Sequence, residues 1–295
     1  MKIECPMQGG SAENCAWSPR AGRVRDFPEV GVIECTSCRL VTHSRDLSPK
    51  VDYKSGSMHK WTEKYGGVLS KSSSDPVRRI SLIKLLATEY ELKLLLDFGC
   101  GSGKMLDVIS KSLPVVGIEP DDSARKNAIE SGHKVFDSIE SFLEAKCPVD
   151  VVSLFHVVEH FYEATMEISR IYDFLQPGGF ILIETPNSND AMLTKYESRE
   201  FQNFTYWSHH PMLHSHESLE GLLTRCGFKV LKNIGVQRYN LNNHLYWLSK
   251  GLPGGHEIWE DFISPIVANG YSEELAKNGM SDTIWMVARK PYRGE

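Results

Sequence analysis

A buried strand that runs directly into a glycine-rich turn is the feature that most constrains how this chain folds. Residues 94–103 read Leu-Leu-Leu-Asp-Phe-Gly-Cys-Gly-Ser-Gly, and residues 104–112 have the apolar spacing of a helix. A strand that is apolar throughout is typical of a parallel sheet covered on both faces. Glycines in the turn allow a ligand to approach the backbone, because no side chain stands in the way. The segment therefore predicts a ligand site at the carboxyl end of a buried strand.

Alternating strands and helices follow along the chain. Besides the strand at 92–98, apolar runs predict strands at 115–118, 134–136, 149–155, 180–184, 228–234 and 283–288, and helical spacing predicts helices at 77–90, 123–131, 163–175 and 216–226. Repeated strand–helix units imply right-handed crossovers and a parallel sheet. We therefore predict an α/β fold with a doubly wound, mostly parallel, seven-stranded sheet.

The spacing of the glycine turn separates three kinds of ligand site. A phosphate-binding P-loop needs glycine where this chain has Phe98 and a hydroxyl residue where it has Met105. A dinucleotide fingerprint needs glycine at the position of Lys104. What the turn does match is Asp-x-Gly-x-Gly-x-Gly, and here the sequence closely resembles the class I S-adenosylmethionine-dependent methyltransferase family.

This resemblance implies a set of cofactor-binding residues. The turn would wrap the methionine part of S-adenosylmethionine, with Asp97 accepting from its ammonium group. Glu119 ends the next strand, 22 positions after Asp97, where a carboxylate can accept hydrogen bonds from both ribose hydroxyls. Asp137 is either an acceptor for the adenine amino group or an ordinary helix cap. The full predicted cofactor set is Asp97, Gly99, Gly101, Gly103, Glu119, Pro120, Asp137 and Phe155.

The segment after the strand at 149–155 resembles the Glu-His segment that many small-molecule members of this family carry beside the transferred methyl group. We predict His160 as the general base, because the pKa of histidine suits proton removal from a hydroxyl acceptor near neutral pH. Glu159 would orient this base or polarise the substrate. His156 is a second candidate base or, like Phe155, a residue packed against adenine. Methyl transfer can also proceed by alignment alone, so a base is not obligatory.

Two segments are expected to contact the acceptor. In the loop at 187–215 we predict Tyr206, His209 and His210 as pocket-lining residues, with a metal site or a surface loop as alternatives. The insertion at 235–282 is long enough to be a lid, a binding element or an interface, including that of a homodimer. Within it, Arg238 and His256 are candidates to bind an anionic or hydroxyl-rich acceptor.

Cysteines dominate the chemistry of the N-terminal region. Cys35 and Cys38 have the C-x-x-C spacing of a zinc knuckle, and Cys5 and Cys15 complete a set of four thiols, with His43 as a substitute ligand. This resembles the zinc-ribbon module that precedes the methyltransferase domain in some enzymes acting on sugars, although Gln8 replaces one expected cysteine. Free buried thiols are the alternative. We thus predict a loop-rich zinc-ribbon-like module at 1–50, a linker or helical segment at 51–76 and a methyltransferase domain at 77–295.

Charge and composition limit the partners. The net charge is −5 and the basic residues are scattered, which disfavours a nucleic-acid partner. No apolar stretch is long enough for a membrane span, and the first residues lack a signal peptide, so we expect a cytoplasmic protein without a membrane partner. The predicted function is methyl transfer to a small hydroxylated metabolite, such as a nucleotide-linked sugar or polysaccharide precursor, preferably on oxygen. The alternatives are an RNA methyltransferase and a non-catalytic zinc-ribbon interaction protein.

Overall fold

The structure, a computed structural model, describes residues 5, 15–48, 53–54, 75–292 and 294. Its largest element is a seven-stranded sheet with the order β10-β11-β8-β7-β4-β5-β6. Strand β11 is antiparallel to both of its neighbours, and the other pairs are parallel. The strands are β4 (Leu95–Phe98), β5 (Val115–Ile118), β6 (Val135–Phe136), β7 (Val149–Phe155), β8 (Leu175–Pro186), β10 (Lys229–Val236) and β11 (Thr283–Arg289). The predicted fold class is confirmed.

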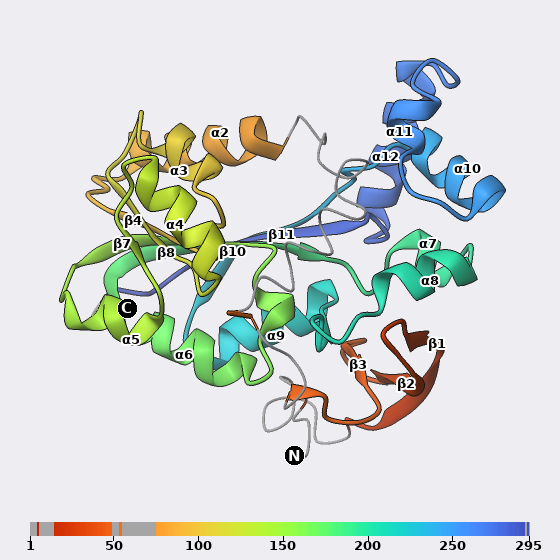
Figure 1. Cartoon of the computed structure of the whole chain (residues 1–295), viewed down its shortest axis with the longest axis horizontal. Coiled ribbons are helices and arrows are strands. Elements are labelled where there is room, and N and C mark those ends of the chain that lie inside the picture. Colours follow the sequence, from red (N-terminus) through yellow and green to blue (C-terminus); the bar gives the residue numbers. More distant parts are fainter. Residues whose placement is uncertain (1–4, 6–14, 49–52, 55–74, 293, 295) are drawn as a thin grey trace.

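Helices cover both faces of this sheet (Figure 1). Helices α2 (Asp75–Glu89) and α3 (Lys104–Ile109) pack on one face through a cluster that includes Ile83, Ile109 and Leu182. Helices α5 (Ile139–Glu144), α6 (Ala164–Phe174) and α9 (His216–Arg225) pack on the other through Phe142, Ile168 and residues of the same strands. Helix α4 (Asp122–Glu130) follows β5. Apolar strands between two helical layers are what a parallel sheet requires.

Some boundaries differ from the sequence-based prediction. Strand β8 begins at Leu175, where the prediction still had a helix, and it includes the Pro-Gly-Gly turn. Helix α5 was not predicted, although its start carries a capping box formed by Ser138 and Ser141. At six residues it is too short for apolar periodicity to identify it.

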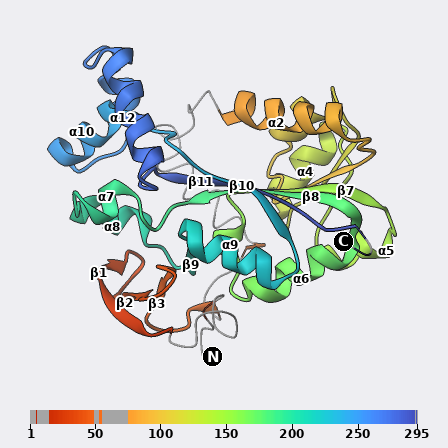
Figure 2. The same cartoon turned by 180° about the vertical axis from the view of Figure 1, so that it is seen from behind.

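The prediction of a loop-rich N-terminal region was wrong for its described part. Strands β1 (Trp17–Val24), β2 (Phe27–Cys35) and β3 (Val41–His43) form an antiparallel sheet, and β9 (Met212–Leu213) completes it. The strands of the β1–β2 hairpin are only half buried and contain proline, glycine and charged residues, which hides their alternation. Because β9 comes from the loop at 187–215, this small sheet joins the N-terminal region to the large domain (Figure 2).

The insertion before β11 is helical. It contains α10 (Leu241–Lys250), α11 (Gly255–Ile258) and α12 (Pro265–Lys277), which lie near α7 (Ala191–Thr194) and α8 (Arg199–Thr205) in both views (Figures 1 and 2). A short 3-10 turn, η2 (Val158–His160), follows β7. None of the helices in the described residues has both the length and the apolar character needed to cross a bilayer.

Replacement of Gly117 by alanine tests the packing beneath the glycine turn. A Cβ atom there would lie 2.4 Å from Cys100 Sγ and 3.3 Å from Leu106 Cδ1. We expect Gly117→Ala to lower the free energy of unfolding by about 1–3 kcal/mol through overpacking, measured by urea denaturation. The double variant with Cys100→Ala should recover part of this loss, because the nearest contact is removed. Equal free energies of unfolding for Gly117→Ala and the wild type would show that the turn accommodates the added methyl group without loss of stability.

Candidate active site

The glycine turn after β4 leaves its backbone open to a ligand. The N–H groups of Gly99 and Cys100 both donate to the carbonyl of Ile118, at 2.8 and 3.1 Å, which fixes the turn against β5. Gly99, Gly101 and Gly103 have φ angles of 75°, 54° and 83°, which disfavour other residues. A Cβ atom added to Gly101 would meet nothing within 4 Å, whereas one on Gly99 would lie 2.6 Å from Val157. Open space beside Gly101 is therefore available to a bound molecule.

Two buried carboxylates flank this turn. Asp97, near the end of β4, accepts a hydrogen bond of 2.6 Å from the Ser153 hydroxyl. Burial, reinforced by the charge of Glu119, raises the pKa of Asp97 to about 6. Glu119 accepts from the N–H groups of Gly101, at 2.7 Å, and Asp121, at 2.9 Å. A carboxylate has about four lone-pair sites, so Glu119 can accept several hydrogen bonds at once.

This arrangement fits the residues expected to hold S-adenosylmethionine. A carboxylate near the end of β4 is suited to an ammonium group, open backbone at Gly101 allows close approach, and Glu119 follows the next strand. Asp137 precedes α5, whose N-cap is Ser138, and it accepts from the hydroxyls of Ser138 and Ser141. Both hydrogen bonds lower the pKa of Asp137, and the one from Ser141 has the larger effect. Pro120 directly follows Glu119, and its carbonyl accepts from Arg125.

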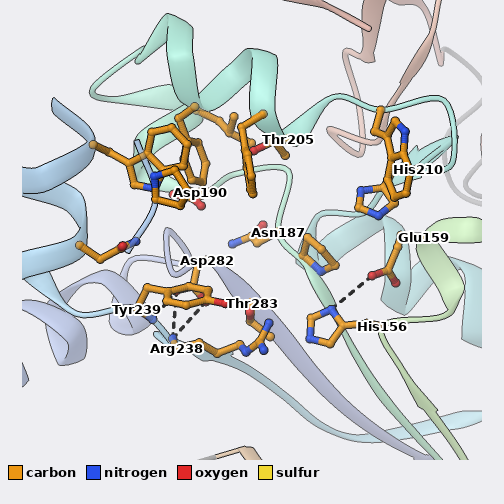
Figure 3. Close-up of a pocket in the computed structure, with 18 of the residues that line it drawn as sticks. His156, Glu159, Asn187, Asp190, Thr205, His210, Arg238, Tyr239, Asp282 and Thr283 are labelled. Carbon is orange, nitrogen blue, oxygen red and sulfur yellow. Dashed lines mark hydrogen bonds and ion pairs between the residues drawn. The ribbon is translucent and has the colours of Figure 1, made fainter. Parts of the chain in front are cut away.

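Just after β7, His156 lies between the buried carboxylates of Glu159 and Glu184, and Figure 3 shows its contact with Glu159. Its Nδ1 is 3.3 Å from Glu159 Oε1 and its Nε2 is 3.3 Å from Glu184 Oε1. Its backbone has a left-handed φ of 59°, and its N–H donates to the Glu184 carbonyl at 2.7 Å. Burial disfavours the imidazolium, but the two carboxylates outweigh it and raise the pKa of His156. His156 is thus better suited to carry a positive charge than to accept a proton.

The same contacts keep Glu159 ionised. Its Oε2 accepts from the Thr185 hydroxyl at 2.9 Å. Burial would raise the pKa of Glu159, but the hydrogen bond and charge of His156 reverse this effect and lower the pKa to about 2. Phe155, the last residue of β7, lies beneath the Arg79 guanidinium, whose central carbon is 4.5 Å from the ring centroid.

His160 has the opposite electrostatic character to His156. Burial lowers the pKa of His160, so its imidazole is neutral near pH 7. Its Nδ1 lies 2.6 Å from the carbonyl oxygen of His209. Because a carbonyl only accepts, Nδ1 carries the proton and Nε2 is left as the basic nitrogen. The ring of His210 packs edge-on at 4.8 Å, and burial also lowers its pKa.

A cavity of about 320 Å³ lies beside these residues. One part of its wall is polar and charged, and the other is aromatic and apolar. The polar wall consists of Arg25, His156, Glu159, His160, Asn187, Asp190, Thr205, His210, Arg238, Tyr239, Asn243, Asp282 and Thr283 (Figure 3). The apolar wall consists of Pro186, Leu193, Phe201, Phe204, Trp207, Trp247 and Pro253.

Among the predicted acceptor residues, only His210 and Arg238 line this cavity. Tyr206 is buried in the core of the small sheet. The ring of His209 stacks on Trp207 at 4.2 Å, and His256 packs against Tyr239. Arg238 itself forms an ion pair with Asp75, the first residue of α2, at 2.5 Å.

Sequence reasoning missed most of the apolar wall and all of the N-terminal contribution. The aromatic run at 201–207 was a signal that could have indicated Phe201, Phe204 and Trp207. No local signal pointed to Arg25, which follows β1 and is far from the other lining residues in sequence.

Two groups of potential metal ligands occur in the described residues. In the first, the ligand atoms of Cys5, Cys35 and Cys38 lie within 4.8 Å of one another, and Cys15 Sγ is 3.3 Å from Cys5 Sγ. None of these four thiols forms a disulfide, and such a group fits a soft divalent ion like zinc. His43 lies outside this group, with its Nε2 3.1 Å from the Trp207 carbonyl.

The second group is Glu159, His160 and His210. Here Glu159 Oε1 lies 3.3 Å from His156 Nδ1, and its Oε2 accepts from the Thr185 hydroxyl. We therefore consider these residues as proton-handling groups.

Comparison with known proteins agrees with this architecture. A family model described as "Methyltransferase domain" matches residues 75–233, which is more than half of the chain. A probable S-adenosylmethionine-dependent methyltransferase of Mycolicibacterium smegmatis is 29% identical over 48% of this chain and 54% of its own length. The mitochondrial ubiquinone biosynthesis O-methyltransferase of mouse is 32% identical over 44% of this chain and 40% of its own length. The chain spans about half the length of these curated relatives.

A solved structure shows the same fold. The S-adenosylmethionine-dependent methyltransferase from Archaeoglobus fulgidus superimposes with a TM-score of 0.54 at 21% identity, covering 79% of this chain and all of that one. The sheet and the glycine turn define a Rossmann-like domain of the class I S-adenosylmethionine-dependent methyltransferase type. The chain belongs to the methyltransferase domain family.

The raised pKa of Asp97 makes a prediction for cofactor binding. An ammonium group binds the ionised carboxylate, so S-adenosylmethionine should bind more tightly as the pH rises through 6. With about one tenth of Asp97 ionised at pH 5, we expect a Kd about tenfold higher at pH 5 than at pH 7.5, measured by calorimetry. Asp97→Asn should bind weakly at both pH values and lose this dependence. A wild-type Kd independent of pH over this range would contradict the role of Asp97.

Proposed function

We propose that this protein transfers a methyl group from S-adenosylmethionine to an oxygen of a small hydroxylated acceptor bound in the 320 Å³ cavity. The observation that carries the proposal is the state of His160. It lines the cavity, it is neutral near pH 7 because burial lowers its pKa, and its Nδ1 proton is committed to the His209 carbonyl. Nε2 is then the available proton acceptor.

The residues around the cavity have distinct proposed roles. S-adenosylmethionine, when bound, supplies an electrophilic methyl group on a sulfonium ion. Asp97, Glu119 and the three turn glycines hold the donor, and Phe155, Pro120 and Asp137 complete its predicted site. His160 Nε2 accepts the acceptor hydroxyl proton, which increases the nucleophilicity of that oxygen. Alignment of the two reactants in the cavity supplies a large part of the acceleration.

Glu159 and His156 have supporting roles beside this base. Ionised Glu159 lies close to His160 and favours its protonated form as the proton arrives. His156 holds Glu159 in place from its position between two carboxylates. We therefore assign Glu159 an electrostatic role and His156 a positioning role in place of the second base.

The composition of the cavity bears on the acceptor. A nucleotide-linked sugar or polysaccharide precursor is the class predicted from the sequence, and Arg238 is the candidate to bind its charge. The aromatic wall, with Trp207 and Trp247, equally suits a flat ring with an apolar body. The names of relatives that are ubiquinone biosynthesis O-methyltransferases make a hydroxylated ring the first acceptor class to assay. The homodimer and the cytoplasmic location stay predictions.

Loss of the base should separate chemistry from cofactor binding. We expect His160→Gln to lower kcat about a hundredfold, within the usual range for a general base, with an unchanged Kd for S-adenosylmethionine. The assay is methyl transfer to hydroxylated acceptors by mass spectrometry, with calorimetry for the cofactor.

The matched control is His216→Gln, because His216 bonds to Asn233 and does not line the cavity. Cofactor binding by the wild type without turnover on any acceptor, RNA included, would favour the non-catalytic alternative. Full activity of His160→Gln would refute the base and leave alignment as the mechanism.

We further propose that the four N-terminal thiols bind a structural zinc ion. The Sγ atoms of Cys35, Cys38 and Cys15 lie 3.5, 3.2 and 3.3 Å from that of Cys5, close to the edge lengths of a tetrahedral thiolate site. The ion would tie Cys5 and Cys15 to the end of β2 and so support the proposed module at 1–50. The proposed domain division keeps 51–76 as the linker and 77–295 as the methyltransferase domain, with 235–282 as a lid or interface.

Metal content tests this proposal. The purified wild type should contain about one zinc ion per chain by elemental analysis, and Cys35→Ser with Cys38→Ser should remove it and lower the melting temperature. Cys226→Ser is the control, because its thiol contacts Ser169 and Thr165, away from the four-thiol group. A metal-free wild type with unmodified thiols, purified with zinc present, would establish free buried cysteines instead.

A further inference from the structure

The proposed base, His160, is oriented by a residue distant in the sequence. His160 lies in the η2 turn, and its Nδ1 donates to the backbone carbonyl of His209, 49 residues later. The orientation and tautomer of the base therefore depend on the position of one peptide group in the loop at 204–213. What holds this loop determines whether Nε2 faces the acceptor.

The tip of the β1–β2 hairpin is hydrogen-bonded to this loop. Arg25 donates from its backbone N–H to the Tyr206 carbonyl at 2.9 Å and from its guanidinium to the Phe204 carbonyl at 2.6 Å. The guanidinium carbon also lies 4.4 Å from the Trp207 ring centroid. The same side chain lines the acceptor cavity.

Asp26, the next residue, fixes the peptide beside His209. Its carboxylate accepts from both the N–H, at 3.1 Å, and the hydroxyl, at 2.5 Å, of Ser208. Ser208 Oγ is in turn 3.2 Å from His209 Nδ1. Hydrogen bonds to an ionised acceptor are about twice as strong as neutral ones, so this pair restrains the loop even near the surface.

Tyr53 forms a hydrogen bond with the His209 carbonyl that orients His160. Its hydroxyl lies 3.2 Å from the His160 carbonyl and 3.3 Å from the His209 carbonyl, and it donates to this pair. Its ring packs edge-on against both imidazoles, at 5.9 and 5.4 Å. Tyr53 thus contacts the residue that carries the proposed base and the residue that orients it.

Further along, β3 pairs with β9 through Thr42 and Met212, and His43 Nε2 donates to the Trp207 carbonyl at 3.1 Å. The loop is therefore held at both ends and in its middle by residues that precede α2.

From these contacts we infer that Arg25, Asp26 and Tyr53, which all precede α2, are working parts of the acceptor site. Arg25 forms part of the acceptor wall, and Asp26 and Tyr53 are positioning residues that fix the His209 carbonyl and, through it, the Nδ1–H tautomer of His160. The inference rests on the proposed function for its effect on rate, but the tautomer itself is a property of the chain.

The experiment uses the full chain and three variants: Tyr53→Phe, Asp26→Asn and the double variant. Nitrogen-15 NMR of the histidine side chains, with His160 assigned by comparison with His160→Gln, reports which ring nitrogen carries the proton. We expect Nδ1–H in the wild type and a mixture of tautomers in the double variant. The kcat should fall about fivefold for each single variant, consistent with the loss of about one net hydrogen bond, with an unchanged Kd for S-adenosylmethionine.

Matched controls separate positioning from general damage. Tyr90→Phe alters a tyrosine whose ring packs on Phe180 in the core, and Glu29→Gln removes an exposed ion pair with Arg45 on the same hairpin. Both should keep the wild-type tautomer and kcat. Thermal melting identifies unfolded variants, and Tyr53→Phe, which removes one oxygen, keeps the test valid if Asp26→Asn does not fold.

The outcomes distinguish the two proposals. A double variant that folds and keeps the wild-type His160 tautomer would overturn the inference. A changed tautomer with an unchanged kcat would support the inference and refute His160 as the base. A changed tautomer with a reduced kcat would support both.

Discussion

The buried carboxylate of Glu184 is the constraint on which the catalytic end of the sheet depends. It lies on β8 and is fully buried, so its charge must be compensated inside the protein. Arg78 and Arg79, both on α2, approach its oxygens at 2.7 and 2.5 Å, and His156 Nε2 lies 3.3 Å away. Removal of one of these partners would leave the buried charge less well compensated, which destabilises the folded state. The network therefore fixes α2 on the sheet and His156 at the end of β7.

This charge distribution gives two neighbouring histidines opposite tasks. His156 is surrounded by Glu159 and Glu184, which raise its pKa, whereas His160 faces the His209 carbonyl and its burial lowers the pKa. The consequence is one imidazole suited to a fixed positive charge and another suited to accepting a proton, four residues apart. The sequence motif shows two histidines and a glutamate, but it does not indicate which histidine carries the charge and which accepts the proton. The distinction follows from Glu184, which lies 28 positions after His156.

The positions of the residues proposed to hold the donor could be predicted from the sequence more directly than those of the acceptor wall, for a physical reason. Asp97, the turn glycines and Glu119 follow two adjacent strands of a regular sheet, so strand order and spacing determine where they lie. The acceptor wall is formed by irregular segments whose positions depend on tertiary contacts. Tyr206 and Trp207 are consecutive, yet the first is buried in the small sheet and the second lines the cavity. Arg25 and the half-buried hairpin that carries it gave no periodic signal at all.

The separation of the two sides also has a functional meaning. The residues proposed to hold the donor follow the parallel strands β4 to β7, whereas the acceptor cavity also draws on the β1–β2 hairpin tip, the segment after β8 and the helical insertion before β11. Polar contacts hold these parts in place: Arg25 of the hairpin donates to the Phe204 carbonyl, and Arg238 of the insertion pairs with Asp75 of α2. Substitutions in them can reshape the acceptor wall without disturbing Glu119 or the glycine turn. Family membership therefore bears on the cofactor class, whereas the acceptor depends on a separately assembled wall whose residues are particular to this chain.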